Sequence, residues 1–253
     1  MNKDLTRQLL NVFGLVFALV INALATTLPL NGITTKQISD NFPVTFTPAG
    51  YVFSIWGIIY LGLIAFAVYQ ALPSQRENPR LRKAGLLFFA SSLLNAFWLI
   101  SFHYLQFGLA LILMLALLVV LIRIYFLFGI GRENVRPIEK WVVNLPFSIY
   151  LGWISVATIA NAAQLLYSLN WNGFGISPEI WTIVMLAVAV LISGMMSFTR
   201  KDIGHALVFI WAFIGIAVKP SIQPIVSTAA WVAVGSVGVL LILGLLLKPN
   251  HKS

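Results

Sequence analysis

Positive charge is distributed along this chain in a way that strongly limits how it can fold. All of its sixteen lysine and arginine residues except Lys36 and Lys219 lie at the N-terminus, in or beside the second, fourth and sixth gaps between long apolar runs, or in the C-terminal tail. Basic loops of helical membrane proteins stay on the cytoplasmic side. The pattern therefore predicts an all-α, polytopic transmembrane helix bundle whose two termini are both cytoplasmic.

The composition agrees with this class and excludes others. Hydrophobic residues make up 60% of the chain and charged residues 9%, whereas roughly 25% of the residues of a soluble domain are charged. The net charge of +9 does not indicate a nucleic-acid partner, because the basic residues flank apolar runs instead of forming one polar surface. They favour contact with anionic membrane lipid. The chain has no cysteine, which excludes disulfides and thiolate sites.

The apolar runs are long enough to cross a bilayer as helices. About eight spans are expected, since a crossing takes roughly 17–25 residues and its backbone must be hydrogen-bonded internally. They lie near 8–30, 51–73, 85–104, 107–129, 141–166, 180–199, 203–218 and 227–247. The first run could be a signal peptide, but it continues to Leu30, which favours a retained helix. The charge pattern supports the short run at 203–218, because the basic tail would otherwise lie outside.

The first outer loop, at about residues 31–50, is expected to be irregular. It contains Pro43 and Pro48 between apolar residues such as Phe42 and Phe46. Apolar side chains are poorly placed in water, so this loop is expected to fold over the outer mouth of the bundle.

No sequence feature indicates catalysis. All seven acidic residues lie in the predicted loops or at helix ends, and no span carries a carboxylate at mid-depth. This weakens the case for a proton- or sodium-coupled carrier, and paired-carboxylate chemistry has no candidate residues. Neither a catalytic residue, a metal site nor a cofactor is predicted. His103 and His205 are expected to be structural.

Three predicted helices each present one face of aromatic and amide residues. With neighbours three or four positions apart, these faces carry Phe53, Trp56 and Tyr60, then Asn95 and Trp98, then Trp153, Ala157 and Asn161. An amide inside a span needs a partner on another helix. The faces therefore fit either contacts that hold the helices together or the walls of a ligand pocket.

The same residues resemble the TspO/MBR family, the tryptophan-rich sensory proteins. The run FTPAGYVFSIW from Phe46 to Trp56, followed by Tyr60, is similar to the start of that family's second helix. LNAFW at 94–98 resembles its third-helix motif, and YLGW at 150–153, with Ala157 and Asn161, resembles its fifth. The resemblance implies a five-helix bundle over residues 1–170 that binds hydrophobic, often tetrapyrrole, ligands. Residues 171–253 would then be an additional three-helix transmembrane extension.

The chain departs from the family pattern at several positions. Ala49 replaces a proline, Tyr51 replaces a tryptophan, and no basic residue follows Tyr167 where the family's proposed sterol-recognition motif needs one. Sterol binding is therefore not expected here.

The leading hypothesis is a bacterial multi-pass membrane protein with a sensory or regulatory role that binds a hydrophobic small molecule such as a porphyrin. Phe46 and Pro48 would shape a lid, while Phe53, Trp56, Tyr60, Trp98, Trp153 and Ala157 would line the pocket and Asn95 and Asn161 would orient the ligand or lock the bundle. An uncoupled transporter remains an alternative, as does a membrane scaffold with a small-residue face such as Gly14 and Ala18 or Gly235 and Gly238. Enzyme activity is the least supported class, and homodimer formation is left open.

Overall fold

A computed structural model describes residues 3–28, 30–34, 37–38, 41–42, 44–220 and 222–247. Lys36 and Pro43 of the first loop and Lys248 and Lys252 of the tail lie outside these ranges. The chain divides into two compact units. Unit 1 comprises Met1–Val44 and Phe53–Trp171, and unit 2 comprises Thr45–Val52 and Asn172–Ser253.

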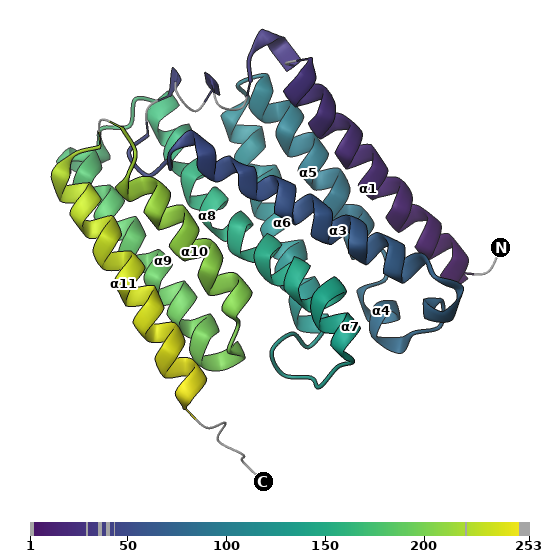
Figure 1. Ribbon diagram of the computed structural model, residues 1–253. Helices are drawn as coiled ribbons and strands as arrows, with labels where there is room; N and C mark the ends of the chain where they lie inside the picture. Colours follow the sequence, from purple (N-terminus) through teal and green to yellow (C-terminus); the bar gives the residue numbers. More distant parts are fainter. Residues whose placement is uncertain are drawn as a thin grey trace. The chain divides into compact units, whose positions relative to one another are not determined.

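The described residues form helices and turns, with no strand among them (Figure 1). The long helices are α1 (Lys3–Thr27), α3 (Ile55–Ala71), α5 (Leu87–His103), α6 (Phe107–Leu127), α8 (Leu145–Ser168), α9 (Pro178–Arg200), α10 (Ile203–Ala217) and α11 (Pro224–Leu246). Each coincides with one of the apolar runs, so the predicted helix positions are confirmed. Six described helical segments are long and apolar enough to cross a membrane, and α5 and α10 are shorter apolar helices.

Unit 1 is a closed ring of its five long helices. Around the ring, α1 contacts α5, α5 contacts α6, α6 contacts α8, α8 contacts α3, and α3 contacts α1. Glycines allow close approach at two of these contacts. A Cβ on Gly14 would lie 2.6 Å from Cδ2 of Phe89, and one on Gly62 would lie 3.0 Å from Cβ of Pro146. The face of α1 that carries Gly14 therefore packs against α5 within unit 1. It is not free to bind a partner protein as a scaffold surface.

A buried ion pair ties the loop after α3 to the segment before α8. Arg80 Nη1 lies 3.1 Å from Glu139 Oε2, and both residues are buried. Arg80 also donates to the carbonyl of Phe128 from Nε at 3.0 Å and Nη2 at 2.7 Å. Glu139 Oε1 accepts from the hydroxyl of Tyr69 at 3.0 Å and from Asn78 Nδ2 at 3.2 Å. Both charges are thus held by several hydrogen bonds, as a buried pair requires.

Unit 2 is a three-helix bundle in which α9, α10 and α11 each contact the other two. The turn between α9 and α10 is tight. Lys201 takes a left-handed conformation after α9, and Asp202 Oδ1 caps α10 by accepting from the backbone N–H of His205 at 3.0 Å. Gly244 of α11 lies against α9, since a Cβ there would come 2.5 Å from the carbonyl oxygen of Ser197.

Replacing Arg80 by methionine should strongly destabilise the protein. Glu139 would remain as a buried, unpaired carboxylate, and breaking such a pair from one side costs about 3–5 kcal/mol. Thermal unfolding in detergent measures the loss. Arg132→Met, which removes an exposed charge, is the matched control and should unfold near the wild-type temperature. An unchanged unfolding temperature for Arg80→Met would show that the pair does not hold the loop.

Candidate functional site: an aromatic and amide cluster

Trp56 of α3 is the centre of a group of stacked and edge-on rings in unit 1. Its ring stacks on Tyr60 at 5.4 Å between centroids and on Trp98 of α5 at 5.9 Å. It meets Trp153 of α8 edge-on at 6.3 Å, and Phe53 also meets Trp153 edge-on, at 6.0 Å. These separations are those of favourable aromatic pairs. The residues predicted on three separate helix faces are therefore brought together.

One buried hydrogen bond joins α5 to α8, and a second, within α8, holds the same amide in place. Trp98 Nε1 donates to Asn161 Oδ1 at 3.0 Å, and Asn161 Nδ2 donates to the carbonyl of Ala157 at 2.8 Å. Trp98, Asn161 and Ala157 are all buried. The amide of Asn161 thus forms one hydrogen bond within its own helix and one with the neighbouring helix. This is the helix-joining role expected of an amide inside a span.

Asn22 of α1 belongs to the same cluster and was missed from the sequence. Its Oδ1 accepts a short hydrogen bond from the hydroxyl of Tyr60, and its Nδ2 donates to Asn95 Oδ1 at 3.2 Å and to Ala18 O at 2.8 Å. The reasoning that singled out Asn95 and Asn161, an amide within an apolar run, applies equally to Asn22.

One buried N–H group in the cluster, Nε1 of Trp153, has no hydrogen-bond partner among the described residues. Trp153 is 3% exposed. The Asn95 side chain, by contrast, is paired with Asn22 and interacts with the hydroxyl of Tyr150. A buried donor without a partner is costly, and its presence in a native structure needs an explanation. An oxygen atom of a bound molecule would supply the missing acceptor.

The ten residues predicted to form the site are divided between the units. Eight lie in unit 1, where Phe53, Trp56, Tyr60, Asn95, Trp98, Trp153, Ala157 and Asn161 are on α3, α5 and α8 or just before α3. Phe46 and Pro48 lie in unit 2. The proposed lid role of these two residues stays a prediction.

The segment Thr45–Val52 is held against α10 within unit 2. The backbone N–H of Ala49 donates to Gly215 O at 2.9 Å, and Trp211 Nε1 donates to Val52 O at 3.1 Å. Gly215 is required at this contact, because a Cβ there would clash with Val52 and lie 3.1 Å from Cβ of Pro48. The C-terminal helices therefore position the residues that directly precede Phe53 and α3.

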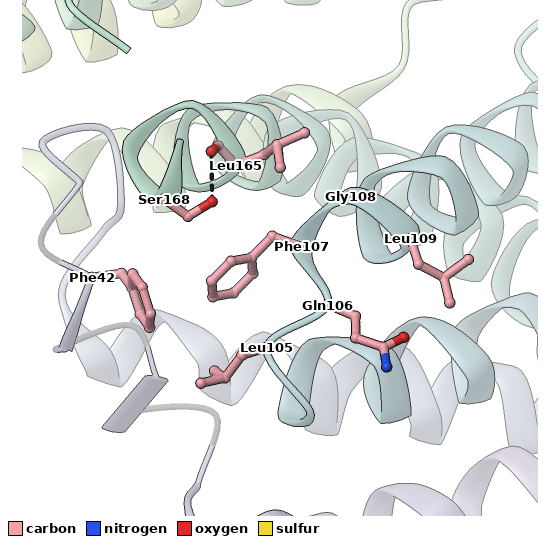
Figure 2. Close-up of a pocket in the computed structure, with 8 residues that line it drawn as sticks. All are labelled: Phe42, Leu105, Gln106, Phe107, Gly108, Leu109, Leu165 and Ser168. Atoms are coloured by element: carbon pink, nitrogen blue, oxygen red, sulfur yellow. Dashed lines mark hydrogen bonds between the residues drawn. The ribbon is translucent and has the colours of Figure 1, made fainter. Parts of the chain in front are cut away.

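A separate pocket opens where α6 begins, near the end of α8 (Figure 2). Its volume is about 570 Å³, and it is lined by Phe42, Leu105, Gln106, Phe107, Gly108, Leu109, Leu165 and Ser168. Phe42 meets Phe107 edge-on at 4.8 Å. Phe107 is followed by Phe102 at 5.9 Å and then Trp98 at 5.6 Å, so rings connect this pocket with the Trp56 cluster.

The cluster combines aromatic rings with uncharged amide groups. The eight site residues in unit 1 and Asn22 include no charged side chain. Among the described residues, no group of three or more histidine and acidic side chains is placed to hold a metal ion. Aromatic surfaces and amide groups in this arrangement fit either helix packing or ligand binding.

Comparison with known proteins identifies a family. The model of a family described as TSPO-like protein matches residues 8–243, a range that includes helices of both units. No curated protein and no solved structure gives a significant match to the chain.

Gly215→Val should destabilise the contact between Thr45–Val52 and α10. The added side chain overlaps Val52, and overpacking of this kind typically costs about 1–3 kcal/mol. Hydrogen exchange at the Ala49 amide, which donates to Gly215, should become faster, and thermal unfolding should shift downward. Gly235→Val on α11 is the control, since nothing lies within 4 Å of a Cβ at that position. Equal exchange rates in the two variants would contradict this description of the segment.

Proposed function

Because the chain belongs to the family of TSPO-like proteins, we propose that it binds a hydrophobic, tetrapyrrole-like molecule within the helix ring of unit 1 and has a sensory or regulatory role. The coarser statement, a helical multi-pass membrane protein of this family, rests on the family match and on the six long apolar helices. The proposal adds the ligand and its place.

The observation that carries the proposal is an unpartnered donor among stacked rings. Trp153 Nε1 is buried without an acceptor among the described residues, and Trp56 contacts Trp153 directly. A planar conjugated molecule with carbonyl or carboxylate oxygens meets both requirements, since its rings stack and its oxygens accept. A porphyrin has both features.

Trp56 is the residue that must move for such a ligand to enter. Its ring fills the centre of the cluster and touches Tyr60, Trp98, Tyr150 and Trp153. Trp56 is only partly buried, so its side chain has a route outward. In this proposal the ligand takes over the stacking contacts that Trp56 makes in the free protein.

The proposal also includes the topology. We infer eight crossings, with α5 and α10 added to the six long helical segments, and both termini in the cytoplasm of a bacterial cell. The basic residues carry this inference, because the loop after α3, the loop after α6 and the turn after α9 then all lie on the cytoplasmic side.

Trp153→Phe should weaken porphyrin binding without removing a hydrogen bond from the free protein. The substitution removes an N–H that has no partner, so no internal hydrogen bond is lost. In the complex it removes one hydrogen bond to the ligand, worth about 1 kcal/mol or roughly a fivefold change in affinity. Titration of protoporphyrin into detergent-solubilised protein, followed by tryptophan quenching and by the porphyrin absorption band, measures the affinity.

The control for this titration is Trp141→Phe, which alters a tryptophan that is 70% exposed and outside the cluster. It should bind like the wild type. Trp56→Phe should weaken binding because it removes a stacking surface. Asn161→Leu should weaken binding because it removes the hydrogen bond that holds Trp98 in place. Wild-type affinity in all three cluster variants would place the porphyrin elsewhere or exclude it.

A further inference from the structure

Arg7, near the start of α1, is a buried cation with incomplete hydrogen bonding. The residue is 7% exposed. Its Nη2 donates to the backbone carbonyl of Arg76 at 2.8 Å, while Nε and Nη1 have no hydrogen-bond partner among the described residues. An arginine side chain stays charged at any physiological pH. A buried guanidinium with free N–H groups therefore calls for an acceptor, and an anion would serve best.

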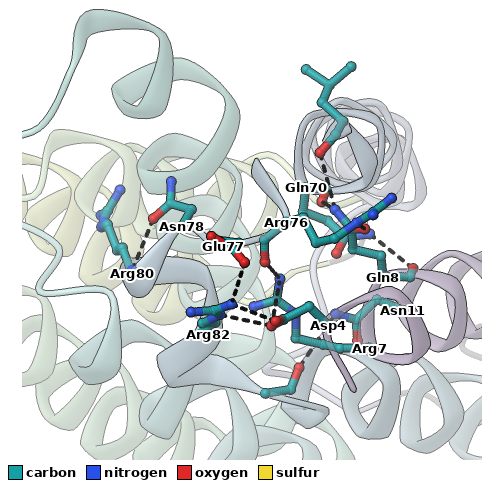
Figure 3. A network of polar contacts seen from close by, with 12 residues as sticks. Asp4, Arg7, Gln8, Asn11, Gln70, Arg76, Glu77, Asn78, Arg80 and Arg82 are labelled. Atoms are coloured by element: carbon teal, nitrogen blue, oxygen red, sulfur yellow. Dashed lines mark hydrogen bonds and ion pairs between the residues drawn. The ribbon is translucent and has the colours of Figure 1, made fainter. Parts of the chain in front are cut away.

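The carboxylate closest to Arg7 is already shared with another arginine. Asp4 Oδ1 lies 3.9 Å from Arg7 Nη2, but the two oxygens of Asp4 accept from Arg82 Nε at 2.8 Å and Arg82 Nη2 at 2.5 Å. Figure 3 shows Asp4 between Arg7 and Arg82, with Arg76 beside them. Three guanidinium groups thus surround one carboxylate. The hydrogen bond with Asp4 raises the pKa of Arg82, so this group also stays charged.

The neighbouring amides of the network have their hydrogen bonds satisfied and do not compete for Arg7. Gln8 Nε2 donates to the backbone carbonyl of Gln70 at 2.7 Å, and Gln8 Oε1 accepts from Arg76 Nε at 3.3 Å. Gln70 Nε2 returns a hydrogen bond to Gln8 O at 3.2 Å. These contacts join α1 to the end of α3 and hold Arg7 and Arg76 in place. The excess positive charge is therefore fixed by the fold.

Exposure increases outward from Arg7. The side chains of Arg7, Asp4 and Arg82 are 7%, 19% and 44% exposed. The pair of Asp4 and Arg82 thus lies nearer the surface than Arg7, and exposed ion pairs of this kind contribute little to stability. The contact between Arg82 and Asp4 can consequently be given up at little cost in stability.

We propose that Arg7, Arg76 and Arg82 form a binding site for a phosphate group, with phosphate oxygens accepting from the free N–H groups of Arg7 and from Arg82. The cluster lies at the end of unit 1 where the charge pattern places the cytoplasmic surface, which is the depth of phospholipid headgroups. A phospholipid of the inner leaflet and a free phosphate ion share this chemistry, and the experiment below distinguishes them. The site is separate from the Trp56 cluster and does not depend on the proposed function.

The test uses full-length protein stripped of lipid in an uncharged, phosphate-free detergent. Phosphatidylglycerol, a phosphate-free glycolipid with the same acyl chains, or inorganic phosphate is added, and thermal unfolding and native mass spectrometry report binding. Phosphatidylglycerol is expected to bind and stabilise the wild type at least tenfold more tightly than the glycolipid. The same effect with inorganic phosphate would support the site with a soluble anion as its ligand.

Two variants assign the effect to Arg7. Arg7→Gln should lose at least tenfold in affinity for the phosphate ligand, whereas Arg132→Gln, which removes an exposed charge outside the cluster, should stay within twofold of the wild type. Arg7→Lys, which keeps the charge but loses the planar donors, should bind more weakly than the wild type. If Arg7→Gln does not fold, the wild-type titration still decides. The proposal is overturned if neither phosphatidylglycerol nor phosphate stabilises the wild type more than the glycolipid does, or if folded Arg7→Gln binds normally.

Discussion

Lipid offers no hydrogen-bonding partner, and this constraint governs both the backbone and the polar side chains of this protein. The apolar runs form helices, in which the backbone groups are hydrogen-bonded to one another. Amide side chains within these helices form hydrogen bonds with a neighbouring helix, as Asn22 does with Asn95 and Asn161 with Trp98. Charged groups lie in the predicted loops and helix ends, and two that are buried there, Arg80 and Glu139, form a fully hydrogen-bonded pair. Polar groups that break this rule are therefore informative.

Buried donors without a partner among the described residues of unit 1 include Trp153 beside stacked rings, Arg7 beside a basic cluster, and Gln164 on α8. The proposals above give the first two a functional interpretation. The first environment suits a planar conjugated ligand with oxygen acceptors, and the second suits a phosphate group. Unit 2 contributes in another way, because it holds Thr45–Val52, and the chain enters unit 1 at Phe53, immediately before α3.

Periodic and local features could be predicted from the sequence, whereas pairings between distant residues could not. The apolar run at 107–129 became α6 at Phe107–Leu127, and the run at 203–218 became α10 at Ile203–Ala217. The shared faces of Trp56, Trp98 and Trp153 followed from helical spacing and from the family motifs. The pairing of Arg80 with Glu139, and of Gly215 with the segment around Val52, depends on which helices become neighbours. Helix spacing contains no information about that choice.

The central claim is that charge asymmetry sets how the chain crosses the membrane, and labelling of introduced cysteines tests it most directly. Because the chain contains no cysteine, single substitutions at the exposed positions Glu77, Asn134 and Asn172 can be probed with a membrane-impermeant thiol reagent in intact cells and in inverted vesicles. The account predicts that positions 77 and 134 react only from the cytoplasmic side and position 172 only from the outside. Labelling of 77 and 134 from opposite sides would contradict it.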